Sequence, residues 1–462
     1  MGITTDADAI ARELKAAGVG EALRPSDPAF VTELTGFNLA IAHAPAVVVP
    51  AVSDEEVVAA VRVAAALDLR VAVLGLGHGM RDGVEGGILI STRRLASVNV
   101  DETTRTATVA AGTTWQQVLD AAAPAGLAPL CGSAPHVGVV GYVLGGGLGP
   151  VARTFGFAAD HVRSMEVVTA DGRLVTADRD EHPDLFWALR GGKVGLGIVT
   201  SITIDLFPLR SVYGGGLYFS AEDAAVVLDG FAEITADLPE SVSASVAMLR
   251  LPPVPALPEV LRGRFVVHVR VVVVGDRAEA ERLVAPFRDL AVPLIDTVGE
   301  LPYAAIGSVH ADPVEPMPFT DGGMLLSAFD PDAVKALLGV AGPGTSAPLA
   351  AVEVRVLGGA IARSPAVPNA VGGRTASHSV HIVGAPVPEL LDGPVPDTIR
   401  AVLAALEPWA SGETQANFFG RANDPDAFDF CWPDRISKRL GIVRGLYDPT
   451  GRFRTADAVT RI

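Results

Sequence analysis

VAVLGLGHGM, residues 71–80, is the stretch from which the rest of this sequence is best interpreted. Its first four residues are apolar and mostly β-branched, which predicts a buried strand. Glycines at 75, 77 and 79 follow, and their missing Cβ atoms let backbone N–H groups approach an anionic ligand such as a phosphate. We therefore expect a loop that holds a nucleotide cofactor, with His78 at its reactive end. The alternative is a turn between strands that contains a hydrogen-bonded histidine.

The overall composition excludes several classes of protein. A chain of 462 residues with 49% apolar and 19% charged residues is expected to be ordered and to form two domains. A net charge of −17 argues against nucleic acid or an anionic membrane surface as a partner. Two cysteines, Cys131 and Cys431, make neither a disulfide scaffold nor a CxxC metal site, and we predict no metal. The acidic N-terminus does not resemble a signal peptide, so a cytoplasmic location is expected.

One long stretch without charge needs separate treatment. Residues 121–152 contain no Asp, Glu, Lys or Arg, which is long enough to raise the question of a membrane span. The same residues hold several prolines and eight glycines after residue 125, and such a backbone would leave polar groups unpaired in lipid. We expect instead a soluble segment whose backbone packs against something large and flat.

The arrangement of strands and glycine loops predicts an α+β fold. The dinucleotide-binding fingerprint G-x-G-x-x-G fails twice, because its last glycine would fall on Met80 in one case and on Pro150 in the other. Beyond residue 209 the sequence changes to alternating strands with two intervening helical segments. This pattern predicts a second domain built on an antiparallel sheet flanked by helices.

Several motifs follow one another along the chain in an order that resembles one family. They are GLGHG (75–79), GSAPHVGVVGYVLGGGLG (132–149), GFAADHV (156–162), DLFWALRGG (184–192), GIVT (197–200), and the pair ANFFG (416–420) and YDPTGRFR (447–454). Together they resemble the vanillyl-alcohol-oxidase/PCMH superfamily of FAD oxidoreductases. The resemblance is to the berberine-bridge-enzyme-like branch, in particular to bacterial members that tailor secondary metabolites.

The resemblance implies an architecture and a cofactor. It implies a two-lobed PCMH-type FAD-binding domain over residues 1–209, a substrate-binding domain over 210–410 and a C-terminal segment, 411–462, that returns to the flavin. It also implies FAD bonded covalently through its 8α-methyl group to His78. The matching motifs imply these further cofactor-binding residues: Leu74, Gly75, Leu76, Gly77, Gly79, Met80, Gly132, Ser133, Val137, Gly138, Gly141, Tyr142, Gly145, Gly146, Gly149, Gly197, Ile198, Val199 and Asn417.

The sequence departs from the family pattern at three places. Many relatives carry a second cofactor-anchoring cysteine where this chain has Ala134, so we expect no second covalent bond there. The tyrosine that many relatives place two residues before Asn417 is Gln415, which puts the usual catalytic base in doubt. The usual run of glycines after the DLFWALRGG motif is interrupted by Lys193, which suggests a change at a surface or interface.

Three residues remain as catalytic candidates. Glu353 and Arg355 alternate with valines, so if the valines face the core, this pair faces the opposite side, which in the family is the flavin cavity. Glu353 is then a candidate general base with a raised pKa; the alternative is a solvated Glu–Arg pair. His136 is expected to contact the flavin, to gate oxygen or to act as an acid or base with a pKa near neutral. Alternatively, it only makes a hydrogen bond in the cavity wall.

The resemblance implies an FAD-linked oxidase acting on a small molecule. Its substrate would lose a hydride to the flavin, with Glu353 or His136 as base, and molecular oxygen would then reoxidise the cofactor. Two alternatives stay open: a flavin-dependent oxygenase of a polyketide-like substrate, and a flavoprotein that directs a non-redox cyclisation. Substrate identity and oligomeric state are not indicated by the sequence.

Overall fold

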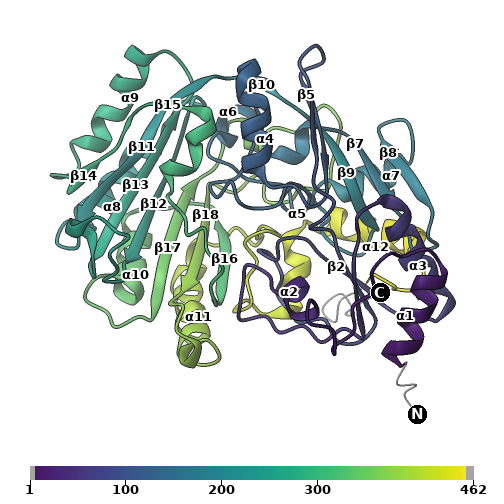
Figure 1. Ribbon diagram of the computed structural model, residues 1–462. Coiled ribbons are helices and arrows are strands. Elements are labelled where there is room, and N and C mark those ends of the chain that lie inside the picture. Colours follow the sequence, from purple (N-terminus) through teal and green to yellow (C-terminus); the bar gives the residue numbers. More distant parts are fainter. Residues whose placement is uncertain (1–5, 454–462) are drawn as a thin grey trace.

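The glycine loop extends from a small parallel sheet. The structure is a computed structural model that describes residues 6–453, except for the side chains of residues 426, 427 and 430. Its first sheet has three parallel strands in the order β1-β3-β2. Helices α1, α2 and α3 accompany this sheet (Figure 1). The bounds of these elements are α1 (Ala7–Ala16), α2 (Phe30–Leu34), β1 (Val47–Pro50), α3 (Asp54–Ala66), β2 (Val71–Leu74) and β3 (Ile88–Ser91).

A second sheet of five antiparallel strands, in the order β4-β5-β9-β7-β8, follows. The glycine-rich residues between β5 and β7 form short helices whose apolar side chains share one core with this sheet. No helix in the part of the chain that the structure describes is long and apolar enough to cross a membrane. The bounds are β4 (Val98–Asp101), β5 (Thr106–Ala110), α4 (Trp115–Ala122), β6 (Leu127–Ala128), α5 (Val139–Leu144), α6 (Ala152–Phe155), β7 (Val162–Val168), β8 (Leu174–Asp178), α7 (Pro183–Leu189), β9 (Ile198–Asp205) and β10 (Phe207–Pro208).

The third and largest sheet is antiparallel throughout. Its eight strands follow the order β14-β11-β13-β12-β17-β18-β16, with β15 paired to β11. Helices α8, α9, α10 and α11 share a second apolar core with one face of this sheet, and the other face looks toward the first two sheets (Figure 1). The bounds are β11 (Ser211–Ser220), α8 (Ala224–Thr235), β12 (Val242–Arg250), β13 (Phe265–Val273), α9 (Arg277–Arg288), β14 (Ile295–Asp296), β15 (Gly299–Pro302), β16 (Asp321–Leu326), α10 (Pro331–Ala341), β17 (Leu349–Val356), β18 (His378–Gly384) and α11 (Pro394–Leu406).

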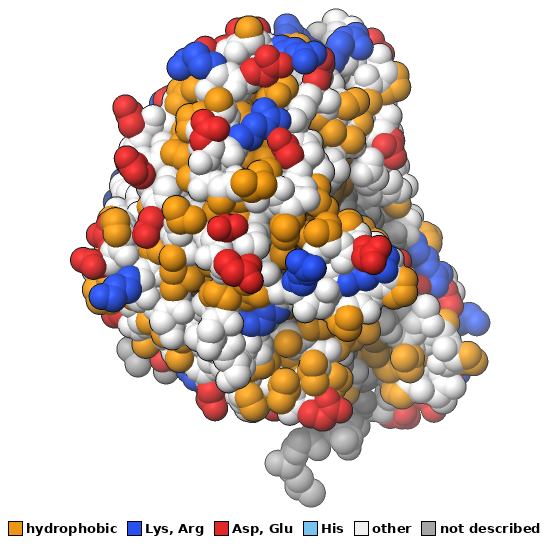
Figure 2. All heavy atoms as spheres, turned by 90° about the vertical axis from the view of Figure 1, so that its left-hand side faces the viewer, with side chains coloured by type: hydrophobic (Ala, Val, Ile, Leu, Met, Phe, Trp, Pro, Cys, Tyr) orange, Lys and Arg blue, Asp and Glu red, His pale blue; other side chains and the backbone are white. Residues whose placement is uncertain are grey.

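The outer face of these helices is a mixed, charged surface. Figure 2 shows acidic and basic side chains interspersed among small apolar groups over this side of the molecule. On α9, Arg277 pairs with Glu281 and Arg282 pairs with Glu279, each one turn apart. These exposed pairs add little stability, but they keep the surface hydrophilic.

The end of the chain returns to its beginning. Helix α12 (Asp434–Tyr447) packs against α7, and Arg439 lies 4.0 Å above the ring of Trp187. Arg452 donates to the carbonyls of Ala64 and Leu69, at the end of α3. The last residue of the YDPTGRFR motif, Arg454, lies outside the described residues, as do residues 1–5 and 455–462. We propose 1–209, 210–410 and 411–462 as the structural units of the chain.

The fold class predicted from the sequence is confirmed. The described residues combine helices with one parallel sheet, the two large antiparallel sheets and a two-stranded antiparallel sheet of β6 and β10, and the largest sheet is flanked by helices as expected. Local features of the sequence set the bounds of these elements: Thr114 and Gln117 form the capping box that begins α4, and Gly172 has a left-handed φ of +72° in the β7–β8 turn.

Candidate functional site

One face of the large sheet carries a row of charged side chains. Val267 and Val269 on β13, and Val352 and Val354 on β17, lie in the core under the helices. Because side chains alternate along a strand, His268, Arg270, Glu353 and Arg355 share the opposite face. The valines of the VEVRV run therefore face the core, and Glu353 and Arg355 face the opposite side. Arg355 donates from Nη1 to the carbonyl of Leu148, 3.1 Å away, which joins this face to the glycine-rich residues 132–149.

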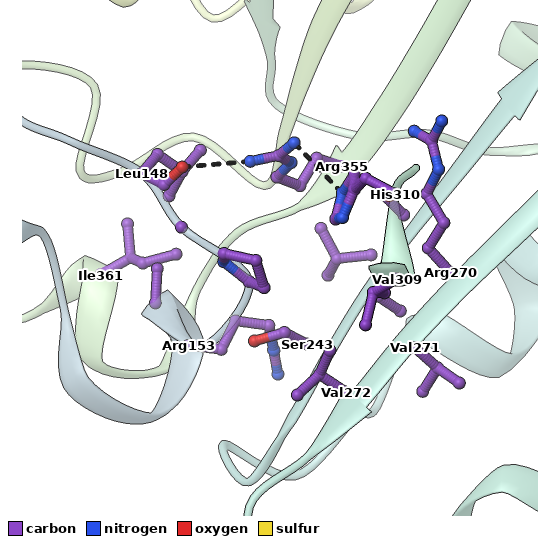
Figure 3. A pocket seen from close by; sticks show the side chains of 16 residues that line it. Leu148, Arg153, Ser243, Arg270, Val271, Val272, Val309, His310, Arg355 and Ile361 are labelled. Carbon is purple, nitrogen blue, oxygen red and sulfur yellow. Dashed lines mark hydrogen bonds between the residues drawn. The ribbon is translucent and has the colours of Figure 1, made fainter. Parts of the chain in front are cut away.

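The charged residues form one buried cluster around the Glu353 carboxylate. Its Oε1 accepts from Arg270 Nη1 at 3.0 Å, and its Oε2 accepts from Arg355 Nη2 at 3.0 Å. Nε2 of His310 lies 3.4 Å from Oε1 of Glu353 and 3.4 Å from Nη2 of Arg355. All four side chains are buried, and the cluster holds two guanidinium groups against one carboxylate. Figure 3 shows Arg355, His310 and Arg270 side by side, with Arg355 joined to both Leu148 and His310.

The pKa expected for Glu353 is wrong in direction. Burial alone would raise the pKa of this carboxyl group, but Arg355, the contact with His310, and Arg270 outweigh it and hold the pKa well below its usual range. The group therefore stays ionised and is a weak base. The alternative of a solvated Glu–Arg pair is also wrong, because Glu353 is only 9% exposed.

His310 in the cluster and His268, which contacts Arg270, are both neutral near pH 7. Burial lowers the pKa of His310, although its contact with Glu353 acts in the opposite direction. Burial and then Arg270 hold the pKa of His268 well below its ordinary value. Since Arg270 donates to Nδ1 of His268, the ring proton is on Nε2, which has no partner among the described residues. The cluster thus carries an excess of one positive charge.

A cavity lies directly behind this cluster. It lies between the Leu148–Arg153 segment and strands β12, β13 and β17, and Figure 3 shows the Arg355–His310 contact along one edge. Its walls are mainly apolar, with Val272, Val309 and Ile361 among them. The guanidinium of Arg153 donates to backbone carbonyls of Leu238, Val242 and Leu357. The site therefore combines an apolar space with a cationic cluster beside it.

His78 lies in an aromatic environment without hydrogen bonds. Its ring stacks on Phe37 with centroids 4.0 Å apart, and His136 lies 5.0 Å away. Both ring nitrogens are buried and have no partner among the described residues. Burial, followed by the neighbouring His136, lowers the pKa of His78 to about 3. The alternative of a hydrogen-bonded turn histidine is therefore wrong, and His78 offers an unprotonated nitrogen to a ligand.

His136 lies beside His78. Burial lowers the pKa of His136, and the more distant Asp312 only partly offsets this. Its ring centroid is 5.3 Å from that of Phe37. Burial thus favours the neutral imidazole, and a role of His136 as an acid or base stays a prediction.

The implied cofactor-binding residues form three groups, and one further residue, Asn417, lies in the C-terminal segment. Leu74 and Gly75–Met80 form the end of β2 and its loop, with Leu74 fully buried. Gly132, Ser133, Val137, Gly138, Gly141, Tyr142, Gly145, Gly146 and Gly149 lie along and around α5, and Leu76 approaches Gly138. Gly197, Ile198 and Val199 begin β9, where Ile198 shares a core with β2 and β3. Asn417, in the C-terminal segment, donates to the carbonyl of Tyr142 at 2.9 Å.

The described residues fit FAD. Gly79 and Gly141 are exposed, and a Cβ atom added at Gly141 would meet nothing within 4 Å. An open space therefore lies in front of glycine backbone, and Gly79 directly follows His78 in the chain. Such a surface suits a dinucleotide whose phosphates need close backbone approach.

A family model described as FAD binding domain matches residues 45–178. These residues form an FAD-binding domain. The match includes the loop of His78, the glycine-rich residues 132–149 and His136. The cofactor inferred from the sequence is thereby confirmed, whereas the role of each residue in binding it stays a prediction.

Curated relatives match parts of the chain. The FAD-dependent monooxygenase tpcD of Cochliobolus heterostrophus is 34% identical over 208 residues, which cover 44% of this chain and 40% of the relative. The (R)-6-hydroxynicotine oxidase of Paenarthrobacter nicotinovorans is 26% identical over 302 residues, 63% of each chain. The matches therefore span less than two thirds of either relative.

A solved structure resembles the chain over nearly its whole length. The glucooligosaccharide oxidase from Acremonium strictum, described with a 6-S-cysteinyl, 8α-N1-histidyl FAD, superposes with a TM-score of 0.84 at 20% identity. The likeness covers 98% of this chain and 99% of that one. The likeness shows that this chain has the same fold as that oxidase.

Sequence reasoning missed three members of the site. Arg270 and His268 carry a signal, because HVR in the FVVHVRVVVV run alternates with valines just as EVR does on β17. His310 follows a 3-10 helix, Tyr303–Val309, and no local pattern places it beside Glu353. Gln415 is buried, and neither atom of its amide has a partner among the described residues.

Substitution of Gly77 tests whether the glycine loop after β2 holds FAD. Gly77 has a φ of +75°, and a Cβ there would lie 2.6 Å from the Cα of Gly36. We expect Gly77→Ala to reduce the FAD content of purified protein strongly, because the loop must move to relieve this backbone clash. Gly86→Ala is the matched control, since Gly86 has a φ of +61° with nothing within 4 Å. The control should lose only about 1 kcal/mol of stability and keep its FAD. Equal FAD content in both variants would contradict the prediction.

Proposed function

We propose that this protein is an FAD-dependent oxidase of a small organic molecule, with molecular oxygen as acceptor. The observation that carries the proposal is the buried Arg270–Glu353–Arg355–His310 cluster, which faces the glycine-rich residues of the FAD-binding domain. Charged side chains are costly to bury and are found mainly at functional sites. When bound, FAD supplies the two-electron redox chemistry, and the protein supplies binding and electrostatics.

Within the cluster, His310 is the residue best placed to accept a proton. Its imidazole is neutral, and its Nδ1 is buried without a partner among the described residues. Glu353, 3.4 Å from Nε2, would stabilise the positive charge that His310 gains. Arg270 and Arg355 keep Glu353 ionised for this role. The His310–Glu353 pair would take the place of the tyrosine that many relatives carry where this chain has Gln415. Glu353 would then act through His310 and would not itself be the base.

The charge of the cluster also indicates a substrate class. Two guanidinium groups against one carboxylate favour a substrate whose oxygen carries or develops negative charge, such as a phenol or a carboxylate. We therefore propose a secondary metabolite with an acidic oxygen as the substrate.

An anaerobic experiment tests the proposal. Holoprotein mixed without oxygen with phenolic and carboxylated polyketides should lose its visible flavin absorbance, whereas glucose oligomers should have little effect. On readmission of oxygen, an oxidase yields one hydrogen peroxide per product. Incorporation of isotopically labelled oxygen into product would instead support the oxygenase alternative, which the match to a monooxygenase favours. Product formed without any flavin reduction would overturn a redox function and indicate the cyclisation alternative.

A further inference from the structure

Lys193 lies where three parts of the FAD-binding region meet. Its Nζ donates to Oδ1 of Asn417 at 2.6 Å and to the carbonyl of Gly141 at 3.2 Å. It is also 3.4 Å from the position that a Cβ atom would take on Gly79. One ammonium group therefore touches α5 and the C-terminal segment and borders the residue that follows His78.

This cation has no anionic partner in the described protein. None of the carboxylates whose side chains are described forms an ion pair with Lys193, and its two acceptors are an amide oxygen and a backbone carbonyl. Burial lowers the pKa of Lys193 to about 8. Lys193 is half-buried, and removing a charge even partly from water without a counter-ion is unfavourable, so such a site is better satisfied when an anion binds.

The backbone conformation of Lys193 also supports a functional role for its side chain. Its φ of +63° is left-handed, a conformation that costs a non-glycine residue about 1–2 kcal/mol and that glycine adopts freely. The loop is fixed by Lys193 N–H donating to Leu144 and by Arg444 donating to Gly192 and Val194. A lysine at a position better suited to glycine suggests that its side chain has a function.

We propose that Lys193 is a cofactor-binding residue whose ammonium group donates to the diphosphate of FAD. The open glycine surface formed by Gly79 and Gly141 lies beside Nζ, and a diphosphate held there would supply the missing negative charge. This inference rests on the FAD-binding domain and is independent of the reaction that the protein catalyses. Lys193 is the residue that interrupts the usual run of glycines. The sequence alone suggested only a change at a surface or interface there, whereas this proposal gives Lys193 a contact with the cofactor.

Binding measurements on apoprotein test this contact. In a His78→Ala background, where FAD binding is reversible, we expect Lys193→Met to weaken FAD binding about 10- to 100-fold, the value of one charge-assisted hydrogen bond. ADP, which has the diphosphate but no flavin, should lose affinity by a similar factor. Riboflavin, which has no phosphate, should bind the two proteins equally. Lys193→Arg should retain most of the FAD affinity, and Lys335→Met, at an exposed lysine, is the matched control.

A second variant separates binding from folding. Lys193→Gly removes the cation and also relieves the left-handed backbone, so its apoprotein should unfold at the same temperature as its parent or higher. It should nevertheless bind FAD and ADP as weakly as Lys193→Met does. Unchanged FAD and ADP affinity in both variants would overturn the proposal. Equal losses for riboflavin and ADP, with a less stable apoprotein, would also overturn it, and would show that Lys193 only fastens the C-terminal segment.

Discussion

Acid precipitation should leave the wild-type protein yellow and the His78→Ala protein colourless, with its FAD in the supernatant. The reason is the state of the imidazole: both nitrogens are buried and unpartnered, and its pKa of about 3 keeps it unprotonated. An unprotonated nitrogen at the edge of a glycine cradle is what a covalent bond to the flavin requires. The measurement is the visible absorbance of pellet and supernatant after denaturation.

His136→Ala is the matched control for this experiment. The His136 ring lies 5.0 Å from His78 and is also neutral, but the attachment is proposed at His78 alone. The control should therefore keep its flavin in the pellet. A yellow pellet from His78→Ala would contradict the prediction and place the attachment elsewhere. Yellow supernatants from all three proteins would show that FAD is bound without a covalent bond.

The glycine loop was predictable because its information is local. A strand of β-branched residues, a run of glycines and one histidine lie within ten residues, and each acts through its own backbone conformation. The position of Glu353 and Arg355 on the sheet face opposite the valines was predictable for the same reason, because strand alternation is a property of consecutive residues.

The charge state of Glu353 was not predictable, because it is set by distant segments. Arg270 reaches Glu353 across β12, where Ala247 lies between His268 and Glu353, and Ser245 lies between Arg270 and Arg355. These small residues leave room for both guanidinium groups above the middle strand. A single sequence indicates neither the strand order nor the position of His310. From the sequence alone, the surroundings of Glu353 were therefore expected to hold only Arg355 as a charged partner. The partners of Lys193 come from equally distant segments.

Glu353→Gln should lower the free energy of unfolding of the protein by about 3–5 kcal/mol at pH 7, because it leaves two buried guanidinium groups without a counter-charge. Glu240→Gln is the matched control. Glu240 pairs with Arg363 at the surface, where both side chains are more than half exposed, so its loss should cost less than about 1 kcal/mol. Urea unfolding monitored by circular dichroism measures both. Similar costs for the two variants would contradict the prediction.

The pH dependence of the stability of Glu353→Gln should show that the loss of the Glu353 charge causes its destabilisation. The pKa of Glu353 is depressed in the folded protein, so its contribution to stability is fully present above its unfolded pKa of about 4.3 and is lost as the pH falls through its folded value. The difference between wild type and Glu353→Gln should therefore shrink in acid, below about pH 4. Replacing Arg270, Glu353 and Arg355 together by apolar residues should restore much of the stability, since buried ion clusters are often no more stabilising than apolar packing. If that triple variant folds and binds FAD but no longer reduces it with substrate, the cluster is present for catalysis and not for stability.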